Sequence, residues 1–226
     1  MHRTPASQDA AGDHTKRRSR CAGWRFVFSA VIVAALVTGL VRGFVIDVYF
    51  IPSASMEPLL TEGDRVLVDK LVDAGTVERG DVVVFDGRGS FDPITDPRSF
   101  PERLVAGTGQ WLGLIGSDTV YVKRVIGVEG DQVLCCSDDG RLTVNGNPVD
   151  EPYVYPGDGA SDLAFDVVVP EGRVWLLGDH RSASMDSRSL LGAPGGGLIA
   201  EDRIIGRAFQ LVWPLDRFAP IDRPVG

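Results

Sequence analysis

The sequence predicts a mainly β domain of about 180 residues, built from antiparallel strands and preceded by a single N-terminal apolar helix. Three observations lead to this prediction. Beyond Asp47, short runs rich in valine, isoleucine and aromatic residues recur, and Gly-Asp or Asn-Gly pairs separate them. The same region contains no long segment with the hydrophobic period of a helix. One uncharged apolar stretch near the N-terminus is long enough to cross a membrane.

Residues 1–20 are polar and rich in Ser, Asp and Arg, and we predict a disordered basic tail there. No charged residue occurs from Phe26 to Val41, and the apolar stretch continues to Ile46 if the Arg42 side chain extends to the lipid headgroups. At 1.5 Å per residue, this length spans a hydrocarbon core of roughly 30 Å. The sequence therefore predicts a transmembrane anchor over residues 21–46.

A cleavable signal peptide is the alternative for this segment, because it too combines a basic start with an apolar stretch. Its apolar part is usually shorter and ends at an Ala-x-Ala-like site, whereas this chain continues as RGFVIDVYFIP. We therefore favour a retained, single-pass anchor. The cluster KRRSR at 16–20 then places the N-terminus in the cytoplasm and residues 47–226 outside it, as an extracytoplasmic domain.

The net charge of −8 is unevenly distributed. Residues 1–46 contain seven Lys or Arg and two Asp, a balance of +5, so that residues 47–226 carry −13. Nucleic-acid binding needs a cationic surface, and an acidic domain therefore argues against a nucleic-acid partner.

Eight segments of the domain are predicted as strands because they are rich in β-branched and aromatic residues. They are 65–72, 81–85, 119–128, 132–136, 141–146, 166–170, 173–178 and 203–213. The sequence NGNP at 145–148 predicts a hairpin or tight turn. Residues 86–118 are a variable insertion with an apolar patch around Trp111, and 152–163 is a second segment without an assignment.

Two serines, Ser53 and Ser55, lie close together in the proline-flanked stretch IPSASMEPLL. Outside the N-terminal tail, only Lys70, Lys123 and His180 offer a nitrogen base that could activate a serine. Lys70 lies beside an aspartate in VLVDKLV and is interpreted as an ordinary surface charge.

Lys123 lies in the predicted strand YVKRVIGV, where alternation puts it on the same face as Tyr121 and Val125. Burial there would lower its pKa, and the neutral amine could then accept a proton from a serine near neutral pH. The competing interpretation is a solvated Lys123–Arg124 pair on an edge strand. Spacing alone favours that second interpretation.

Four blocks of the sequence together resemble the type I signal peptidases, membrane-bound serine proteases with a Ser–Lys dyad. The blocks are PSASMEP (52–58), GDVVVF (80–85), YVKRVIGVEGD (121–131) and GDHRSASMDSR (178–188). They follow the apolar segment in the order that is typical of the family. The resemblance implies an antiparallel β-sheet ectodomain of the signal-peptidase type.

The resemblance also implies a role for each matching residue. Ser55, directly before the methionine, is the expected nucleophile, and Lys123 is the expected general base. Ser53 is expected to stabilise the oxyanion, and Ser184 to orient the lysine. The expected supporting residues are Asp179, Asp186 and Arg188, and the residues expected to line shallow pockets for small substrate side chains are Ile51, Met56, Leu60, Tyr121 and Val122. No metal or organic cofactor is implied.

His180 and Ala183 stand where many members of the family have asparagine. His180 therefore offers a rival mechanism, a Ser–His–Asp triad with Asp179 or Asp186. The sequence has no G-x-S-x-G motif, which disfavours that triad. Ala54, between the two serines, replaces a common glycine and is a small change.

The resemblance implies a membrane-bound endopeptidase that removes N-terminal signal peptides from exported preproteins at small-x-small sites. Two alternatives are a dedicated processing protease for a narrow set of precursors and a non-catalytic, membrane-tethered β module that binds export machinery. We expect a monomer in a bacterial cell membrane, in contact with the lipid bilayer and near the secretion translocon.

Cys135 and Cys136 are adjacent, and no cysteine spacing in the chain resembles a zinc site. A vicinal disulfide, two ordinary thiols and a bond with another partner are all open for them. We assign these cysteines no catalytic role.

Overall fold

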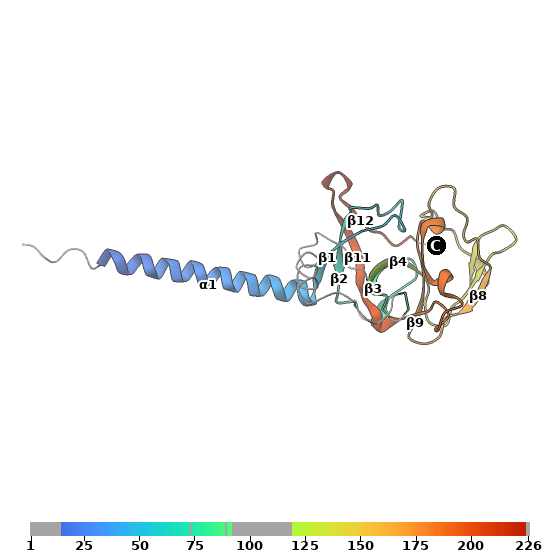
Figure 1. Cartoon of the computed structure of the whole chain (residues 1–226), viewed down its shortest axis with the longest axis horizontal. Helices are drawn as coiled ribbons and strands as arrows, with labels where there is room; N and C mark the ends of the chain where they lie inside the picture. Colours follow the sequence, from blue (N-terminus) through green and yellow to red (C-terminus); the bar gives the residue numbers. More distant parts are fainter. Residues whose placement is uncertain (1–14, 73, 89, 92–118, 225–226) are drawn as a thin grey trace, which may run out of the picture. The chain divides into compact units, whose positions relative to one another are not determined.

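The structure is a computed structural model that describes residues 15–72, 74–88, 90–91 and 119–224. The chain divides into two compact units, Met1–Gly43 and Phe44–Gly226. Among the described residues, the first contains one long helix and the second contains the strands (Figure 1).

Helix α1 runs from Thr15 to Phe44. Its segment Gly23–Phe44, with a mean hydropathy of 2.1, is long and apolar enough to cross a membrane by length and composition. At 1.5 Å per residue these residues extend about 33 Å. The helix includes residues 15–20, which the sequence analysis assigns to the tail, and it ends before Ile46, which opens the first strand.

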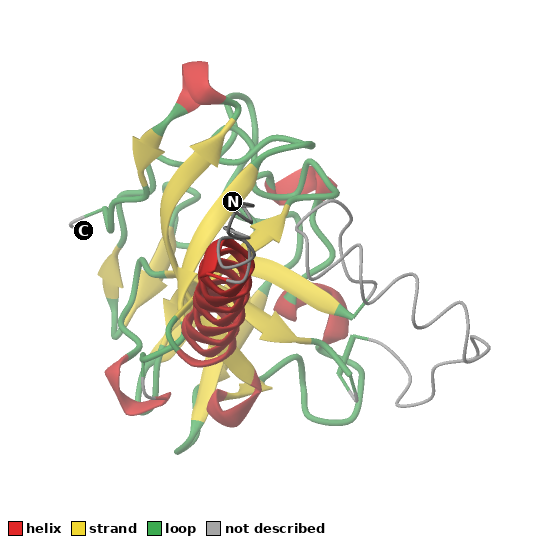
Figure 2. Ribbon diagram, turned by 90° about the vertical axis from the view of Figure 1, so that its left-hand side faces the viewer, coloured by secondary structure: helices red, strands yellow, loops and turns green. Residues whose placement is uncertain are grey.

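The larger sheet of the second unit is entirely antiparallel between its paired strands. Its order is β1 (Ile46–Phe50), β2 (Arg65–Asp69), β11 (Ile204–Trp213), β3 (Val82–Asp86), β4 (Val120–Gly127), β9 (Arg173–Leu177) and β10 (Ile199–Ala200). The short strand β12 (Ala219–Pro220) pairs with β11. Figure 2 shows these strands in yellow.

The smaller sheet is also antiparallel, with the order β7 (Asn147–Pro148), β6 (Leu142–Val144), β5 (Gln132–Cys135) and β8 (Phe165–Val168). Helical structure in this unit is limited, among the described residues, to short 3-10 turns. They are η1 (Ala74–Thr76), η2 (Arg181–Ala183), η3 (Ser187–Leu190), η4 (Glu201–Arg203) and η5 (Leu215–Arg217).

The prediction of a mainly antiparallel β domain after one apolar helix is confirmed, and each of the eight predicted strands is present with shifted ends. The turn predicted within 145–148 is formed by Asn145 and Gly146, which join β6 to β7. Asn145 and Gly146 adopt φ values of 53° and 77° there, the left-handed conformation that Asn-Gly hairpin turns require. Sequence analysis missed β1, whose apolar residues continue the anchor, and it missed the two-residue strands β7, β10 and β12.

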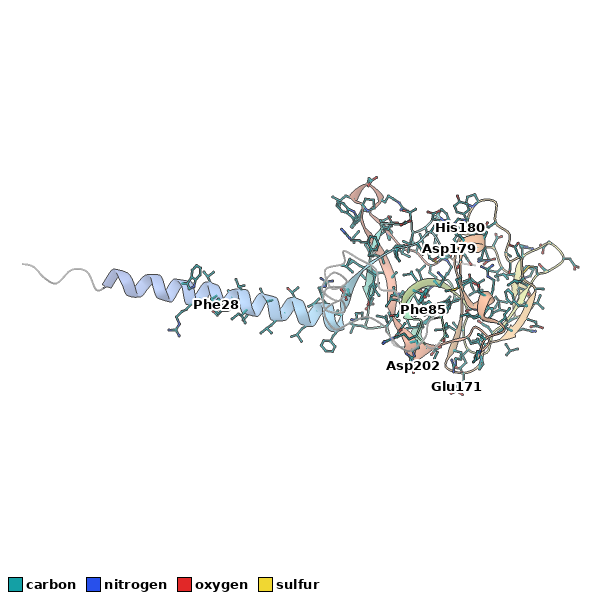
Figure 3. The ribbon with its side chains drawn as sticks, viewed as in Figure 1. Phe28, Phe85, Glu171, Asp179, His180 and Asp202 are labelled. Atoms are coloured by element: carbon teal, nitrogen blue, oxygen red, sulfur yellow. A yellow bond between two sulfur atoms is a disulfide. The ribbon has the colours of Figure 1, made fainter. Side chains whose placement is uncertain are left out.

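Strand β3 is buried on both faces. Val82 and Val84 pack into one apolar cluster with residues of β2 and β11, whereas Val83 and Phe85 pack into another with residues of β4 and β9. Successive side chains of a strand point to opposite faces, so an uninterrupted apolar run is what a strand between two cores needs. Figure 3 shows Phe85 inside the body of the domain. A third cluster lies against the smaller sheet.

Strand β9 ends before the start of β4 is covered, which leaves part of β4, including Lys123, without a paired strand on that side. Pairing between β4 and β9 begins at Arg124 and Leu177, so residues 120–123 of β4 extend past the end of β9. The chain leaves β9 at Gly178, where an added Cβ would lie 2.5 Å from the carbonyl oxygen of Ser55. Glycine therefore allows the turn that contains Ser55 to approach the end of β9 closely. Most of the insertion, residues 92–118 with the patch around Trp111, lies outside the described residues.

Candidate functional site

The turn that contains the two serines is anchored at both ends. Ile51 N donates to Asp64 O at 2.9 Å, and Leu60 N donates to Met56 O at 2.9 Å. The side chains of Ile51, Met56 and Leu60 are at most 2% exposed and belong to the apolar cluster under β2 and β11. Burial of these three side chains holds the turn against the sheet, with Ser53 exposed and Ser55 buried between them.

Lys123 and Ser55, 68 residues apart in the chain, form a direct contact. Lys123 Nζ lies 2.7 Å from Ser55 Oγ and donates to Val122 O at 3.1 Å. Lys123 is 3% exposed and Ser55 is 8% exposed. The interpretation of Lys123 as a solvated surface charge is therefore wrong: the amine is buried and its hydrogen-bond partner is a serine hydroxyl.

Burial lowers the pKa of Lys123 from 10.5 to about 8. Desolvation of the ammonium group is the main cause, and Arg188 acts in the same direction. The carboxylates of Asp186 and Asp179 oppose the shift because they stabilise the charged form. A substantial fraction of the amine is neutral at mildly alkaline pH as a result.

Ser53 lies on the exposed side of Ser55. The two hydroxyl oxygens are 3.3 Å apart, and either can be the donor. If Ser55 Oγ attacks a carbonyl group, the carbonyl oxygen that gains negative charge would therefore lie within reach of the Ser53 hydroxyl.

Arg124, the residue after Lys123, forms a buried ion pair with Asp179. Its Nε and Nη2 donate to the two carboxylate oxygens at 2.8 and 2.6 Å, and its Nη1 donates to Gly80 O at 2.8 Å. Arg124 is 1% exposed and Asp179 is fully buried. The guanidinium also lies 4.1 Å from the centre of the Tyr153 ring. This pair ties β4 to the loop that follows β9, directly beside Lys123.

Asp186 and Arg188 form a second buried pair in the same loop. Arg188 Nε and Nη2 donate to Asp186 at 2.9 and 2.7 Å, and Arg188 Nη2 also donates to Arg181 O. The Asp186 carboxylate accepts from the main-chain nitrogen of Gly178 at 3.1 Å. The structure thus places Asp179, Asp186 and Arg188 in ion pairs that shape the loop.

Ser184 differs from its expected contact. Its Oγ is buried and has no hydrogen-bond partner among the described residues, so the expected hydrogen bond to Lys123 is not formed. The hydroxyl packs against Gly178 instead. The hydrogen bonds of Lys123 Nζ go to Ser55 and Val122.

His180 does not complete a Ser–His–Asp triad. Its Nδ1 lies 3.3 Å from Ala54 O, a main-chain atom, rather than at the Ser55 hydroxyl. The two candidate carboxylates, Asp179 and Asp186, are bound by Arg124 and Arg188. Figure 3 labels Asp179 and His180, which are adjacent in the chain.

The expected pocket residues lie in two separate clusters. Val122 packs with Met56 and Leu60 in the first cluster. Tyr121 packs in the other, where its ring lies 5.8 Å from that of Phe85 and 5.0 Å from that of Phe91. Alternation along β4 explains the division, since neighbouring residues face opposite sides of the sheet. Tyr121 is therefore separated from the other four.

Sequence analysis missed two arginines that hold the segments around the site together. Arg124 was interpreted as a solvated charge. Arg217, in η5, donates to Asp64 at 2.6 Å and to Leu59 O at 3.0 Å, and so ties the C-terminal segment to the turn. Both arginines bind carboxylates in segments that are distant in sequence, so no local pattern could have revealed their roles.

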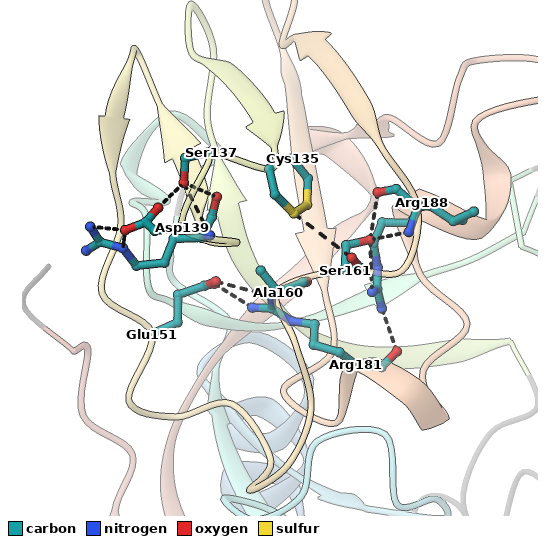
Figure 4. Close-up of a disulfide and its surroundings, with 11 residues drawn as sticks. Cys135, Ser137, Asp139, Glu151, Ala160, Ser161, Arg181 and Arg188 are labelled. Carbon is teal, nitrogen blue, oxygen red and sulfur yellow. Dashed lines mark hydrogen bonds and ion pairs between the residues drawn. A yellow bond between two sulfur atoms is a disulfide. The ribbon is translucent and has the colours of Figure 1, made fainter.

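Cys135 and Cys136 form a vicinal disulfide (Figure 4). Cys136 Sγ lies 4.0 Å from Ser161 O, and Ser161 Oγ accepts from Arg188 at 3.5 Å. Of the three alternatives for these cysteines, the structure has the first. Within the described ranges, no three His, Cys, Asp or Glu side chains converge as metal ligands would.

The family model and the similar sequences agree on one family. The family described as signal peptidase, peptidase S26, matches residues 24–213. Similar proteins include a probable signal peptidase I of Mycobacterium leprae (strain TN), 36% identical over 94% of this chain and 84% of its own length. Another is signal peptidase I T of Bacillus subtilis (strain 168), 33% identical over 83% of this chain and 84% of its own length. A crystal structure of a signal peptidase I from Enterococcus faecalis V583 covers 58% of this chain and 95% of its own, with 22% identity and a TM-score of 0.37.

Proposed function

Since this chain belongs to the signal peptidase family, peptidase S26, we propose that Ser55 is the nucleophile and Lys123 the general base of its peptide-bond cleavage. The chain has signal peptidase I activity and cleaves signal peptides from preproteins. The alternative of a non-catalytic β module is therefore wrong. The assignment of the two residues rests on the 2.7 Å distance between Lys123 Nζ and Ser55 Oγ.

The chemistry follows from that contact. The neutral Lys123 amine takes the proton of Ser55 Oγ as this oxygen attacks the carbonyl carbon of the scissile bond. The protonated lysine then delivers the proton to the leaving amine nitrogen, the C–N bond breaks, and an ester remains on Ser55. Water, deprotonated by the same lysine, hydrolyses the ester and restores the serine hydroxyl.

The oxyanion needs donors on the outer side of Ser55. The Ser53 hydroxyl and the Ser55 main-chain amide fill this role in our proposal, and the 3.3 Å distance between the two serine oxygens supports it. Asp179, Asp186 and Arg188 take no part in proton transfer. They hold the loop after β9 and set the electrostatic potential at Lys123.

The substrate is a preprotein with small residues at both ends of a small-x-small site. In our proposal Met56, Leu60 and Val122, with Ile51, supply an apolar floor next to Ser55 that accepts only small side chains. Tyr121 lies in the other cluster and is left out of this proposed lining.

The location follows from the apolar helix, which is consistent with the membrane anchor of a signal peptidase. We infer a single-pass protein of a bacterial cell membrane, with the N-terminus in the cytoplasm, because KRRSR precedes the apolar segment Gly23–Phe44 of α1. The catalytic domain then works as a monomer outside the cytoplasm, beside the lipid bilayer and near the secretion translocon.

The pH dependence of cleavage tests the base. Only the neutral form of Lys123 can accept the serine proton, and the lowered pKa of about 8 sets the pH above which this form predominates. We expect kcat/KM to rise about tenfold per pH unit up to about pH 8 and to level off above it. The measurement is the initial rate of preprotein cleavage by the full-length protein in detergent micelles between about pH 6 and pH 10. A rate independent of pH over this range would exclude Lys123 as the base.

A substrate panel separates a general signal peptidase from a dedicated processing protease. Preproteins from unrelated exported proteins, all with Ala-x-Ala sites, should be cleaved with kcat/KM values within about tenfold of one another. In each, replacing the alanine next to the scissile bond by leucine should stop cleavage, because the larger side chain does not fit the floor next to Ser55. Cleavage of only one member of the panel would favour the dedicated protease.

A further inference from the structure

We propose that His180 is a positioning residue for the nucleophile: it holds the turn of Ser55 in register with Lys123 through two consecutive main-chain carbonyls. This inference rests on the proposed roles of Ser55 and Lys123. His180 lies in the loop after β9, in the position that the rival triad would give to a catalytic base, but its contacts are with the main chain of the turn.

One residue holds both carbonyls. His180 N donates to Ser55 O at 3.2 Å, and its ring Nδ1 lies 3.3 Å from Ala54 O. A carbonyl oxygen can only accept a hydrogen bond, so Nδ1 carries the proton in this contact. The two bonds restrain the peptide units on either side of the Ser55 Cα, and hence the direction in which Ser55 Oγ points.

The ring itself is held in place. It stacks on Tyr155 with 3.9 Å between ring centres and an angle of 11°. Tyr155 is fixed in turn, because its main-chain nitrogen donates to Asp179 O at 3.0 Å. Glu57 Oε2 lies 3.7 Å from Nδ1. The His180 side chain is only 17% exposed. Stacking and burial leave the imidazole little freedom to turn away from Ala54.

His180 also completes a closed set of contacts. Lys123 contacts Ser55, and its neighbour Arg124 binds Asp179 through both carboxylate oxygens. Asp179 precedes His180, which binds the turn of Ser55. The proposed base, Lys123, is the chain neighbour of Arg124, and the turn of the proposed nucleophile is bound by His180, the chain neighbour of Asp179. The Arg124–Asp179 ion pair links these two parts of the site. The Arg124–Asp179 pair fixes the position of β4, which contains Lys123, and the His180 contacts fix the position of the turn that contains Ser55.

The expected effect is on the rate of the chemical step. Loss of the imidazole removes the side-chain bond to Ala54 O, which still accepts from Glu57 N at 3.0 Å, while the main-chain bond to Ser55 O can persist. A displacement of about 1 Å at a reacting group can cost on the order of 100-fold in rate. With one of two restraints removed, we expect kcat for His180→Ala to fall about tenfold. KM should change less than about twofold, because the turn orients the nucleophile rather than binding the substrate.

The test compares His180→Ala with His180→Asn in the full-length protein in detergent micelles, with an Ala-x-Ala preprotein as substrate. The asparagine side-chain amide can place an N–H near the position of Nδ1, so it should restore the bond to Ala54 without the stacked ring. We expect kcat of His180→Asn to lie within about threefold of wild type. Phe165→Leu, which removes a ring from the core of the smaller sheet, is the control for loss of stability alone.

Three outcomes would overturn the inference. Wild-type kcat for His180→Ala would show that the ring does not position the turn. A kcat for His180→Asn as low as that for His180→Ala would show that the bond to Ala54 is not what matters. A loss as large as that for Ser55→Ala would make His180 a base. If His180→Ala does not fold, Tyr155→Leu replaces it: removing the stack should lower kcat about threefold, and an unchanged kcat counts against the inference.

The same assay separates this inference from the proposed function. If Ser55→Ala or Lys123→Met keeps its activity, the dyad itself fails. If both are inactive while His180→Ala cleaves as fast as wild type, the dyad stands and only the positioning role of His180 is wrong.

Discussion

Replacing Ser55 by alanine is expected to lower kcat for preprotein cleavage by on the order of 10⁴-fold or more, because the attacking oxygen is removed. The fold should persist. Ser55 makes no contribution to the apolar clusters, and its loss leaves Lys123 Nζ bonded to Val122 O. The expected cost in free energy of unfolding is therefore about 1 kcal/mol. Single-turnover cleavage and urea unfolding of the same preparation measure both quantities.

Ser53→Ala is the matched control, since it removes the same hydroxyl two residues earlier in the same turn. If Ser53 donates to the oxyanion, its loss should lower kcat by about 10²- to 10³-fold, which is less than the effect at Ser55. Equal losses at both serines would contradict the division of roles between them. Measurable turnover by Ser55→Ala would remove Ser55 as the nucleophile.

Lys123→Met is expected to reduce cleavage about as severely as Ser55→Ala, and to make the folded domain more stable. Methionine has nearly the shape of lysine but cannot accept a proton. The wild-type lysine has a pKa of about 8 in the folded state and 10.5 as its ordinary value. Burying its charged form therefore costs about 3 kcal/mol at pH 7. Allowing for the lost hydrogen bonds, the free energy of unfolding should rise by about 1–3 kcal/mol in the variant.

The direction in which the free energy of unfolding changes with pH gives a second check. Below about pH 8 Lys123 is charged in both the folded and the unfolded state, and the full free-energy cost of burying its charge is present. Between about 8 and 10.5 only the unfolded chain keeps the proton, so the stability of the wild type increases with pH through this window. The Lys123→Met variant should lack this increase. Urea midpoints at several pH values measure it.

Lys70→Met is the control for the second prediction, because it makes the same substitution at the other lysine of the described domain. It should leave the rate of cleavage within about twofold of wild type and the stability within about 0.5 kcal/mol. A loss of activity in Lys70→Met similar to that in Lys123→Met would mean that charge removal, rather than removal of the base, explains the result.

Much of the fold could be predicted from local patterns. Strand β3 was visible as an uninterrupted apolar run, and the turn between β6 and β7 was visible as Asn-Gly, because both signals depend on neighbouring residues alone. Strand β1 was hidden, since its residues Ile46–Phe50 continue the apolar composition of the helix before it. No local signal separates a helix from a strand in such a stretch.

The candidate site was less accessible. The pattern around Lys123 favoured a solvated charge, and only the resemblance to a family pointed to the base. Whether a lysine is buried depends on what covers it, and here the cover includes a turn 68 residues earlier in the chain. The expected bond from Ser184 and the placement of Tyr121 beside Met56 differed from the structure for the same reason: each depends on how two distant segments pack.

By itself, the sequence determined that the chain has one apolar helix, that the domain is built of antiparallel strands, and that very few residues could serve as a nitrogen base. These properties follow from composition and short-range periodicity. Only the tertiary structure decided that Lys123 is dehydrated, that its amine lies 2.7 Å from Ser55 Oγ, and that His180 holds the main chain of that turn. Desolvation and distance arise where separate segments pack together, so no single segment encodes them.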